Sequence, residues 1–188
     1  MNCYEGIMTL DGDLSAGGEK EHYLGKLHRF MCKKLGKGHV GDQRQYLYYR
    51  WPGQDYVFVR SAVAMPEMGI VDEVSVEMSE GQELFVKVPV RAIRRSGERR
   101  KVLVVPESEM EIHGTELLER NGFAVLLCAT SKDLCGVLDR ESRKEAFNYY
   151  ELSARVRVVD AEKAAHAYCS GLGRGKAFGM GLMLCQPV

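Results

Sequence analysis

The sequence predicts an α+β protein made of two similar halves. Short stretches rich in aromatic and β-branched residues recur along the whole chain, as β-strands do. A helical pattern with one apolar stripe, from Glu19 or Lys20 to Lys34, stands between predicted strands in the first half. A second helical segment, from Ala161 to Tyr168, stands between strands near the end. A β-α-β order that occurs twice favours two tandem ferredoxin-like domains with antiparallel sheets.

The first half begins with a predicted strand at residues 2–10 and continues, after a polar loop, into the helix. At about 100° per residue, one face of that helix collects its large apolar side chains, Leu24, Leu27, Met31 and Leu35. Basic residues occupy nearly the opposite face, and a Gly-Lys-Gly segment ends the helix. Two strands follow at residues 45–51 and 55–64, and Pro52-Gly53 joins them into a predicted hairpin.

Further predicted elements follow, in this order: an extended stretch near 74–78 at the end of the first half, then in the second half an extended stretch at 83–93, a helical segment at 107–120, and strands at 124–128 and 152–159. Asp160 is a suitable N-cap for the last helix, because its carboxylate can accept a hydrogen bond from a free backbone N–H. No low-complexity linker separates the halves, so we expect them to pack together. The predicted domains are residues 1–81 and residues 82–188.

Composition and charge limit the class of protein. Lys and Arg total 26, as do Asp and Glu, so the net charge is zero. No apolar run approaches the roughly 18 residues of a membrane span, and the first residues lack the features of a secretory signal. We therefore expect a soluble, cytoplasmic protein. The six cysteines are scattered without a C-x-x-C pair, which favours small core residues over a zinc site. Neither a metal nor a cofactor is expected.

The basic residues are concentrated in one segment. Seven of them lie between Lys87 and Lys101, against the single acid Glu98. The residues from Arg91 to Arg100, with Gly97 near the centre, are the predicted tip of a long hairpin that returns through residues 102–105. Such a segment can bind a polyanion locally in a protein without net charge. The alternative is a solvated loop.

The C-terminal segment from Gly171 to Gly181 contains five glycines within eleven positions. Glycine allows positive φ and close backbone approach, and exposed N–H groups beside two cations, Arg174 and Lys176, make an anion site suited to phosphate. The segment differs from a Walker loop, because Lys176 is not followed by Ser or Thr ahead of a helix. The alternative is a tight turn before a buried terminal strand at residues 182–184.

The order of these landmarks resembles a known family. A helix with the context Leu27-His28-Arg29 follows the first strand, and a hairpin leads to Met65-Pro66. The arginine-rich hairpin comes next, and the sequence GLGRGKAFGMGLM closes the chain. This order resembles the CRISPR repeat-processing endoribonucleases, most closely the CasE type of type I-E systems. Similar enzymes serve type IV systems.

The resemblance implies two RNA-recognition-like domains that bind the stem-loop of a CRISPR repeat RNA. It implies metal-independent cleavage of the precursor at the 3′ side of the stem, a 2′,3′-cyclic phosphate product, and retention of the mature crRNA within a multi-subunit effector complex. The basic hairpin and the glycine loop would hold the RNA backbone. The candidate RNA-binding residues are Arg91, Arg94, Arg95, Arg99, Arg100, Lys101, Gly171, Gly173, Arg174, Gly175 and Lys176.

Metal-free cleavage needs a base for the 2′-OH proton, an acid for the leaving group, and cations for the phosphate charge. His28 matches the family histidine by position, at the edge of the apolar stripe, and His22 is the fallback. Without the resemblance, His28 would be interpreted as a structural histidine at the core edge. The family often has a tyrosine three residues before this histidine, where this chain has Gly25. Tyr23 and Lys26 are the candidate assisting residues, and a solvated surface lysine is the alternative for Lys26.

Two other functions stay open from the sequence. Gly25 in place of tyrosine favours a catalytically inactive subunit that retains the crRNA 3′ hairpin in an effector complex. A nucleotide-binding domain that uses the glycine loop is the other, and the missing Ser or Thr after Lys176 argues against it. The aromatic residues of 45–51 could stack on bases, although alternating aromatics in a strand usually belong to the core.

Overall fold

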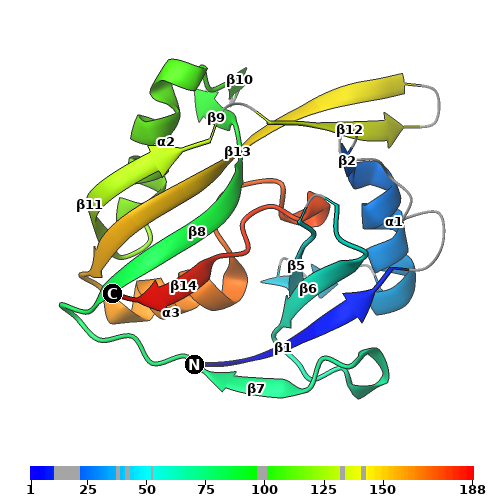
Figure 1. Ribbon diagram of the computed structural model, residues 1–188, viewed down its shortest axis with the longest axis horizontal. Coiled ribbons are helices and arrows are strands. Elements are labelled where there is room, and N and C mark those ends of the chain that lie inside the picture. Colours follow the sequence, from blue (N-terminus) through cyan, green and yellow to red (C-terminus); the bar gives the residue numbers. More distant parts are fainter. Residues whose placement is uncertain are drawn as a thin grey trace.

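The computed structural model describes residues 1–10, 22–36, 39–40, 43–51, 53–96, 101–131, 134–140 and 143–188. Within these ranges the chain builds two main sheets that lie beside each other, with helices packed against both (Figure 1). The mixed α and β composition and the largely antiparallel pairing confirm the predicted fold class. The predicted boundary between residues 81 and 82 stays a prediction.

The first sheet is built from strands of the first half in the order β5-β6-β1-β7, and its described pairs are antiparallel. Its strands are β1 (Asn2–Thr9), β5 (Tyr46–Tyr49), β6 (Tyr56–Ser61) and β7 (Asp72–Ser75). Helix α1 (Leu24–Leu35) turns Leu27 and Met31 into the core of this half, as the apolar stripe predicts. The helix starts later than expected, because His22–Tyr23 form the short strand β2. Gly36 follows the helix with φ of 78°.

The second sheet has the order β14-β8-β13-β12-β2, and β11 also pairs with β13. Its strands are β8 (Glu83–Arg91), β11 (Phe123–Thr130), β12 (Leu134–Arg140), β13 (Arg143–Val158) and β14 (Leu184–Pro187). Apolar side chains from β8 and β13 form its core with those of α2 (Met110–Glu119) and α3 (Ala161–Ser170). Asp160 accepts a hydrogen bond from the backbone N–H of Lys163 at 3.0 Å, which confirms the predicted cap.

Further differences from the sequence-based prediction concern strands, among them β7 (Asp72–Ser75), which was expected near 74–78. Strand β13 begins at Arg143, well before the expected residue 152, and its first part pairs with β12, which was not expected. The terminal strand begins at Leu184, whereas residues 182–184 were expected. Leu182 and Met183 are nevertheless fully buried, as that prediction requires.

The basic segment forms the antiparallel pair β9 (Ile93–Ser96) and β10 (Lys101–Val104), so a hairpin is present as predicted. Its tip, with Arg99 and Arg100, lies outside the described residues. Short elements complete the fold: β3 (His39–Val40) pairs with β4 (Gln43–Arg44), and single 3-10 turns lie at Pro66–Met68 and Glu107–Glu109.

A buried ion pair connects the first sheet to the second half. The Arg60 side chain on β6 is 1% exposed, and its Nε lies 2.6 Å from Glu5 Oε1 on β1. One terminal nitrogen donates to the carbonyls of Tyr168 and Met183, at 2.9 Å and 2.8 Å. The guanidinium also lies over the Tyr168 ring, 3.6 Å from its centroid. The Arg60 side chain thereby contacts β1, α3 and the segment that precedes β14.

None of the helices in the described ranges is both long and apolar enough to cross a membrane. In the same part of the chain, no three His, Cys, Asp or Glu side chains gather in an arrangement that could hold a metal ion. The described cysteines are free thiols, buried or partly buried, in agreement with the interpretation as small core residues.

Candidate functional site

The glycine loop connects α3 to β14 and folds tightly onto both halves. Gly171, Gly173, Gly175, Gly179 and Gly181 all have positive φ, between 65° and 86°. The Gly181 N–H donates to Pro89 O on β8 at 2.7 Å, and its carbonyl accepts from Leu172 N at 2.8 Å. A Cβ at Gly181 would overlap the Leu172 carbonyl oxygen. The glycines here serve backbone packing, which agrees with the tight-turn interpretation and leaves phosphate contact to the exposed part of the loop.

His28 lies against this loop. Its ring centroid is 5.1 Å from that of Phe178, which belongs to the 3-10 turn η4 (Lys176–Phe178). The Phe178 ring in turn lies 5.3 Å from the Phe147 ring on β13. The Cys32 Sγ atom, one helical turn after His28, is 3.7 Å from both imidazole nitrogens. The half-buried His28 is therefore positioned by the second half of the molecule as well as by its own helix.

The aromatic chain continues to the basic segment. The Arg91 guanidinium carbon, at the end of β8, lies 4.4 Å from the centroid of the Phe147 ring. A series of contacts thus runs from α1 to the base of the basic hairpin. His28 contacts Phe178, Phe178 contacts Phe147, and Phe147 contacts Arg91. The predicted proton-transfer residue His28 and the predicted cationic residue Arg91 are therefore connected through two aromatic rings.

The proposed assisting residues are placed differently. Lys26 is exposed on α1, and residues two apart on a helix do not face each other. Tyr23 and the fallback His22 contribute backbone to β2, which pairs in parallel with Val137 and Gly136 of β12. The orientation of their side chains lies outside the described structure. Gly25 is buried on the face of α1 that also buries Leu24.

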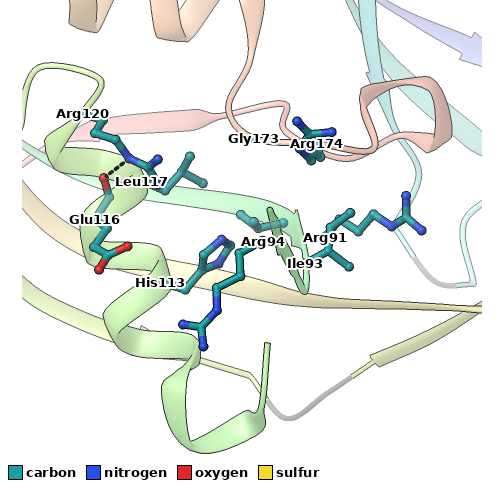
Figure 2. Close-up of a pocket in the computed structure, with 10 residues that line it drawn as sticks. Arg91, Ile93, Arg94, His113, Glu116, Leu117, Arg120, Gly173 and Arg174 are labelled. Carbon is teal, nitrogen blue, oxygen red and sulfur yellow. Dashed lines mark hydrogen bonds between the residues drawn. The ribbon is translucent and has the colours of Figure 1, made fainter. Parts of the chain in front are cut away.

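A pocket of about 460 Å³ joins the base of the hairpin to the glycine loop (Figure 2). It is lined by residues of β8 and β9, of α2 and its C-terminus, and of the loop: Val90, Arg91, Ile93, Arg94, His113, Glu116, Leu117, Arg120, Gly173 and Arg174. The lining contains four arginines and one carboxylate, so the pocket is cationic. Its size falls in the range of about 300–1,000 Å³ that is typical of small-molecule sites.

The charged groups of the pocket are partly held in place. Arg94 pairs with Glu109 at 2.8 Å, and the Nε of Arg120 donates to the Glu116 carbonyl at 3.0 Å. His113 Nδ1 lies 2.7 Å from the Tyr150 hydroxyl. Burial, with a further contribution from the Arg120 charge, lowers the pKa of His113 below its usual value, so the ring is neutral near pH 7.

The structure brings some of the predicted RNA-binding residues together. Arg91, Arg94, Gly173 and Arg174 line the same pocket. Gly171 is buried beside Leu47, and Gly175 lies close to Phe147. The ammonium of Lys176 donates to the Ser170 carbonyl at 2.7 Å, so one of its donors stabilises the end of α3. The side chains of Arg95 and Lys101, like the residues Arg99 and Arg100, lie outside the described structure.

The strand aromatics belong to the core. Tyr46 and Tyr48 are buried, and their hydroxyls donate to the carbonyls of Gly36 and Ala177 at 3.0 Å and 2.6 Å. The core interpretation is therefore confirmed for these two residues. The bond from Tyr48 also fixes the glycine loop to β5 in the first half.

Sequence reasoning missed the contribution of α2 to the pocket. Residues 107–119 contain five glutamates, so the segment was interpreted as acidic and His113 and Arg120 were not considered as site residues. Their spacing is nevertheless informative: His113, Glu116 and Arg120 recur at intervals of three and four, which places them on one helical face. This polar helical face, with its histidine and arginine, could have indicated that α2 contributes to a site.

Comparison with known proteins gives the class. A family model described as CRISPR associated protein matches residues 8–187. This chain therefore belongs to that family of CRISPR-associated proteins. No curated protein matches it.

Solved structures share the fold over the full chain. The structure of Thermus thermophilus Cse3 bound to an RNA representing a pre-cleavage complex has a TM-score of 0.77 at 19% identity, and 100% of each chain is covered. Cas6e from Escherichia coli K-12 has a TM-score of 0.67 at 14% identity, again with 100% of each chain covered. A chain of a CRISPR RNA-guided surveillance complex has a TM-score of 0.61 at 16% identity, with 98% of this chain and 100% of that chain covered. The expected resemblance to CasE-type proteins is confirmed at the level of the fold.

Proposed function

We propose that this protein is a metal-independent endoribonuclease that processes precursor CRISPR RNA. It binds the stem-loop of a repeat and cleaves at the 3′ side of the stem, with a 2′,3′-cyclic phosphate as the product end. It then stays bound to the mature crRNA together with other subunits of an effector complex. The family membership and the shared fold with Cse3 bound to RNA support this proposal.

The observation that carries the proposal is the contact series from His28 through Phe178 and Phe147 to Arg91. Metal-free cleavage of RNA needs a proton-transfer group next to cations that hold the phosphate backbone. Histidine suits the first role because its unperturbed pKa is near 6.5. The arginines of the pocket suit the second, because a guanidinium spans two phosphate oxygens.

The chemistry assigned to His28 is the transfer of one proton. As a base it accepts the proton of the 2′-OH, whose oxygen then attacks the adjacent phosphorus. As an acid it donates a proton to the 5′-oxygen that leaves. Either role gives a 2′,3′-cyclic phosphate and a free 5′-OH, and neither role requires a metal ion.

The decisive experiment uses stem-loop RNA from the CRISPR repeats of the source genome, incubated with the protein in EDTA. We expect a single cut at the 3′ side of the stem, with a cyclic phosphate identified by mass. His28→Ala should reduce the rate by at least about 10²-fold, since general acid–base catalysis contributes that much, and leave affinity nearly unchanged. His166→Ala is the matched control, because His166 is exposed on α3. Equal loss of rate in both variants would contradict the role of His28.

A second candidate function is an inactive RNA-binding subunit that retains the crRNA 3′ hairpin. The buried Gly25 favours it, because the family often has a tyrosine at this position. The same incubation separates the two functions. Tight binding of the hairpin by the unmodified protein, without cleavage at any pH from 6 to 9, would support the inactive subunit.

A further inference from the structure

The cationic pocket contains groups that stem binding by the hairpin and the loop does not require. His113 and Leu117 come from α2 and Arg120 directly follows it, whereas Gly173 and Arg174 come from the glycine loop, which Leu117 reaches at Gly173 (Figure 2). The His113 ring lies in the middle of the labelled side chains in that view. A pocket of this size accommodates one small-molecule-sized group and is too small for a duplex stem.

The hydrogen-bond partner of His113 fixes what its ring presents. Tyr150 is fully buried, and in the described part of the chain its hydroxyl makes a hydrogen bond with His113 Nδ1, at 2.7 Å. A buried hydroxyl keeps a partner for its proton, so the hydroxyl donates to Nδ1. The neutral ring then carries its own proton on Nε2 and acts there as a donor.

Donors therefore dominate the pocket. Arg91, Arg94, Arg120 and Arg174 supply N–H groups, and the acids near them are Glu116, which lines the pocket, and Glu109, which pairs with Arg94. Val90, Ile93 and Leu117 supply apolar surface. A ligand that matches this lining has an anionic group for the guanidiniums, a flat face for the apolar wall, and an edge rich in acceptors.

We propose that this pocket binds one unpaired nucleotide of the RNA segment that flanks the stem. The phosphate lies on the guanidiniums of the hairpin base and the loop, and the base lies between Leu117 and His113 with an acceptor on Nε2–H. Unpaired bases of RNA are recognised in this way, splayed from the stack and held by their edges. The inference rests on the proposed function, because it assumes that the chain binds a repeat stem.

The proposal is tested by measuring how tightly three RNAs bind to the protein. The protein carries His28→Ala, so that the RNAs are not cleaved. The RNAs are the stem-loop alone, the stem-loop with a few unpaired nucleotides on the 5′ side, and the same with the extension on the 3′ side. We expect one extension to increase affinity. Arg120→Gln should reduce the affinity for that RNA by about tenfold and lower its salt slope by about one, with a smaller effect on the stem alone.

Arg155→Gln is the matched control, since Arg155 is an exposed arginine on β13 that pairs with Glu83 outside the pocket. It should keep the gain in affinity from the extension. Equal affinity for all three RNAs, or a gain that survives Arg120→Gln in a protein with unchanged thermal unfolding, would overturn the proposal.

A crosslinking measurement separates this inference from the proposed function. A short single-stranded RNA with one 4-thiouridine should crosslink to the peptide that contains His113, and inorganic phosphate should compete weakly. If the stem-loop is not bound but this crosslink forms, the proposed function fails and the pocket remains a nucleotide site. If uridine monophosphate displaces the RNA at equal concentration, the occupant is a free nucleotide and the assignment to flanking RNA is wrong.

Discussion

At the scale of single residues, Arg60 shows how a charge becomes part of the core. It is fully buried, yet Glu5, two carbonyls and the Tyr168 ring surround its guanidinium. The Glu5 carboxylate also accepts from the Tyr168 hydroxyl at 3.0 Å. Burying a charge is costly unless it is paired and hydrogen-bonded, and this cluster meets both conditions.

We therefore expect Arg60→Ala to lower the free energy of unfolding by roughly 3–5 kcal/mol, because the half-buried Glu5 carboxylate would lose its counter-charge. Urea unfolding at neutral pH measures the change. Lys34→Ala, on the exposed side of α1, is the control and should stay within about 0.5 kcal/mol of the unmodified protein. A loss as small as that of the control would mean that Arg60 is solvated in solution.

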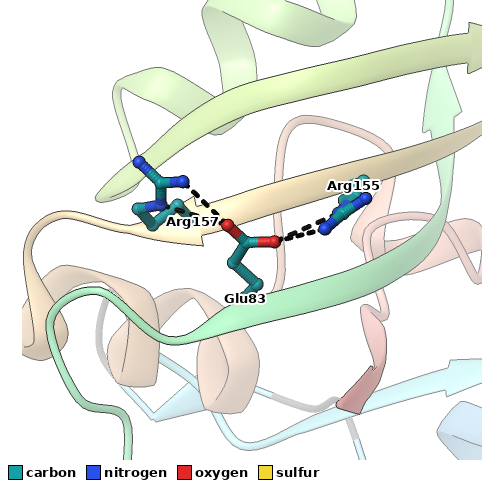
Figure 3. Close-up of polar contacts among 3 residues, drawn as sticks. All are labelled: Glu83, Arg155 and Arg157. Atoms are coloured by element: carbon teal, nitrogen blue, oxygen red, sulfur yellow. Dashed lines mark hydrogen bonds and ion pairs between the residues drawn. The ribbon is translucent and has the colours of Figure 1, made fainter. Parts of the chain in front are cut away.

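Glu83 on β8 occupies a different environment, on the solvent-facing side of the second sheet (Figure 3). Its two carboxylate oxygens pair with Arg157 and Arg155 of β13, at 2.8 Å and 2.7 Å. The hydrogen bonds from Arg157 and then Arg155 lower the pKa of this carboxyl below its usual value. The folded state therefore favours the ionised form more strongly than the unfolded chain does.

Because folding lowers the pKa of Glu83, we expect Glu83→Gln to lower the urea midpoint of unfolding near neutral pH and to have no effect on it in acid. The contribution of the ionised carboxylate is present above the unfolded pKa, and it is lost as pH falls through the lowered folded value. High salt should reduce the difference, since the pair is exposed. Glu80→Gln in the adjacent turn serves as the comparison. A difference that persists below pH 3 would contradict the electrostatic explanation.

At the scale of elements, the glycine loop is a packed connection whose backbone contacts leave little room for side chains. Gly171 and Gly181 approach each other closely, and Gly181 also reaches Pro89 on β8. Positive φ and close approach are separate requirements, and Gly81 shows only the first. Its φ is 83°, against 82° for Gly181, and no atom lies within 4 Å of its missing Cβ.

This pair of glycines gives a matched test. Gly81→Ala should cost about 1–2 kcal/mol, the energy of a left-handed conformation for alanine. Gly181→Ala should cost roughly 3 kcal/mol or more, because the methyl group would also overlap Leu172. Thermal unfolding of the two variants measures the difference between them. Equal losses would mean that the loop relaxes around the added methyl without cost.

The sequence predicted most elements of the fold, because their patterns are local. The stripe of α1, the pairing of β5 with β6 and the Asp160 cap each depend on residues close together in the chain. The hairpin of β12 and β13 was missed. Its segment from Lys132 to Arg143 is rich in charged residues, and strand pairing across distant residues, rather than apolar alternation, defines it.

At the scale of the whole molecule, the turn η4 connects the candidate site to both halves. Phe178 touches His28 of the first half and Phe147 of the second, while Ala177 accepts from Tyr48. The sequence predicted His28 and the loop separately, and their contact depends on how the halves dock. The helix face of His113 and Arg120 was missed for the same reason, since a surface helix acquires its role from what it faces.

We expect Phe178→Ala to lower the cleavage rate roughly 10- to 100-fold with little loss of RNA affinity, because His28 would lose its position relative to the bound phosphate. Single-turnover cleavage and filter binding give the two quantities. Phe30→Ala is the control, since Phe30 lies on the same helix but packs into the core of the first half. If Phe30→Ala lowers the rate equally, general loosening of α1 explains both effects.

The parallel pairing of β2 with β12 has a consequence for dissection of the protein. His22 and Tyr23 open the helix that bears the candidate histidine, yet they hydrogen-bond into the sheet built mostly from residues beyond Glu83. A fragment cut after residue 81 would leave this helix without its upstream anchor. The two ferredoxin-like units are therefore interlocked, and we expect separately expressed pieces to lose the position of His28 relative to the second half.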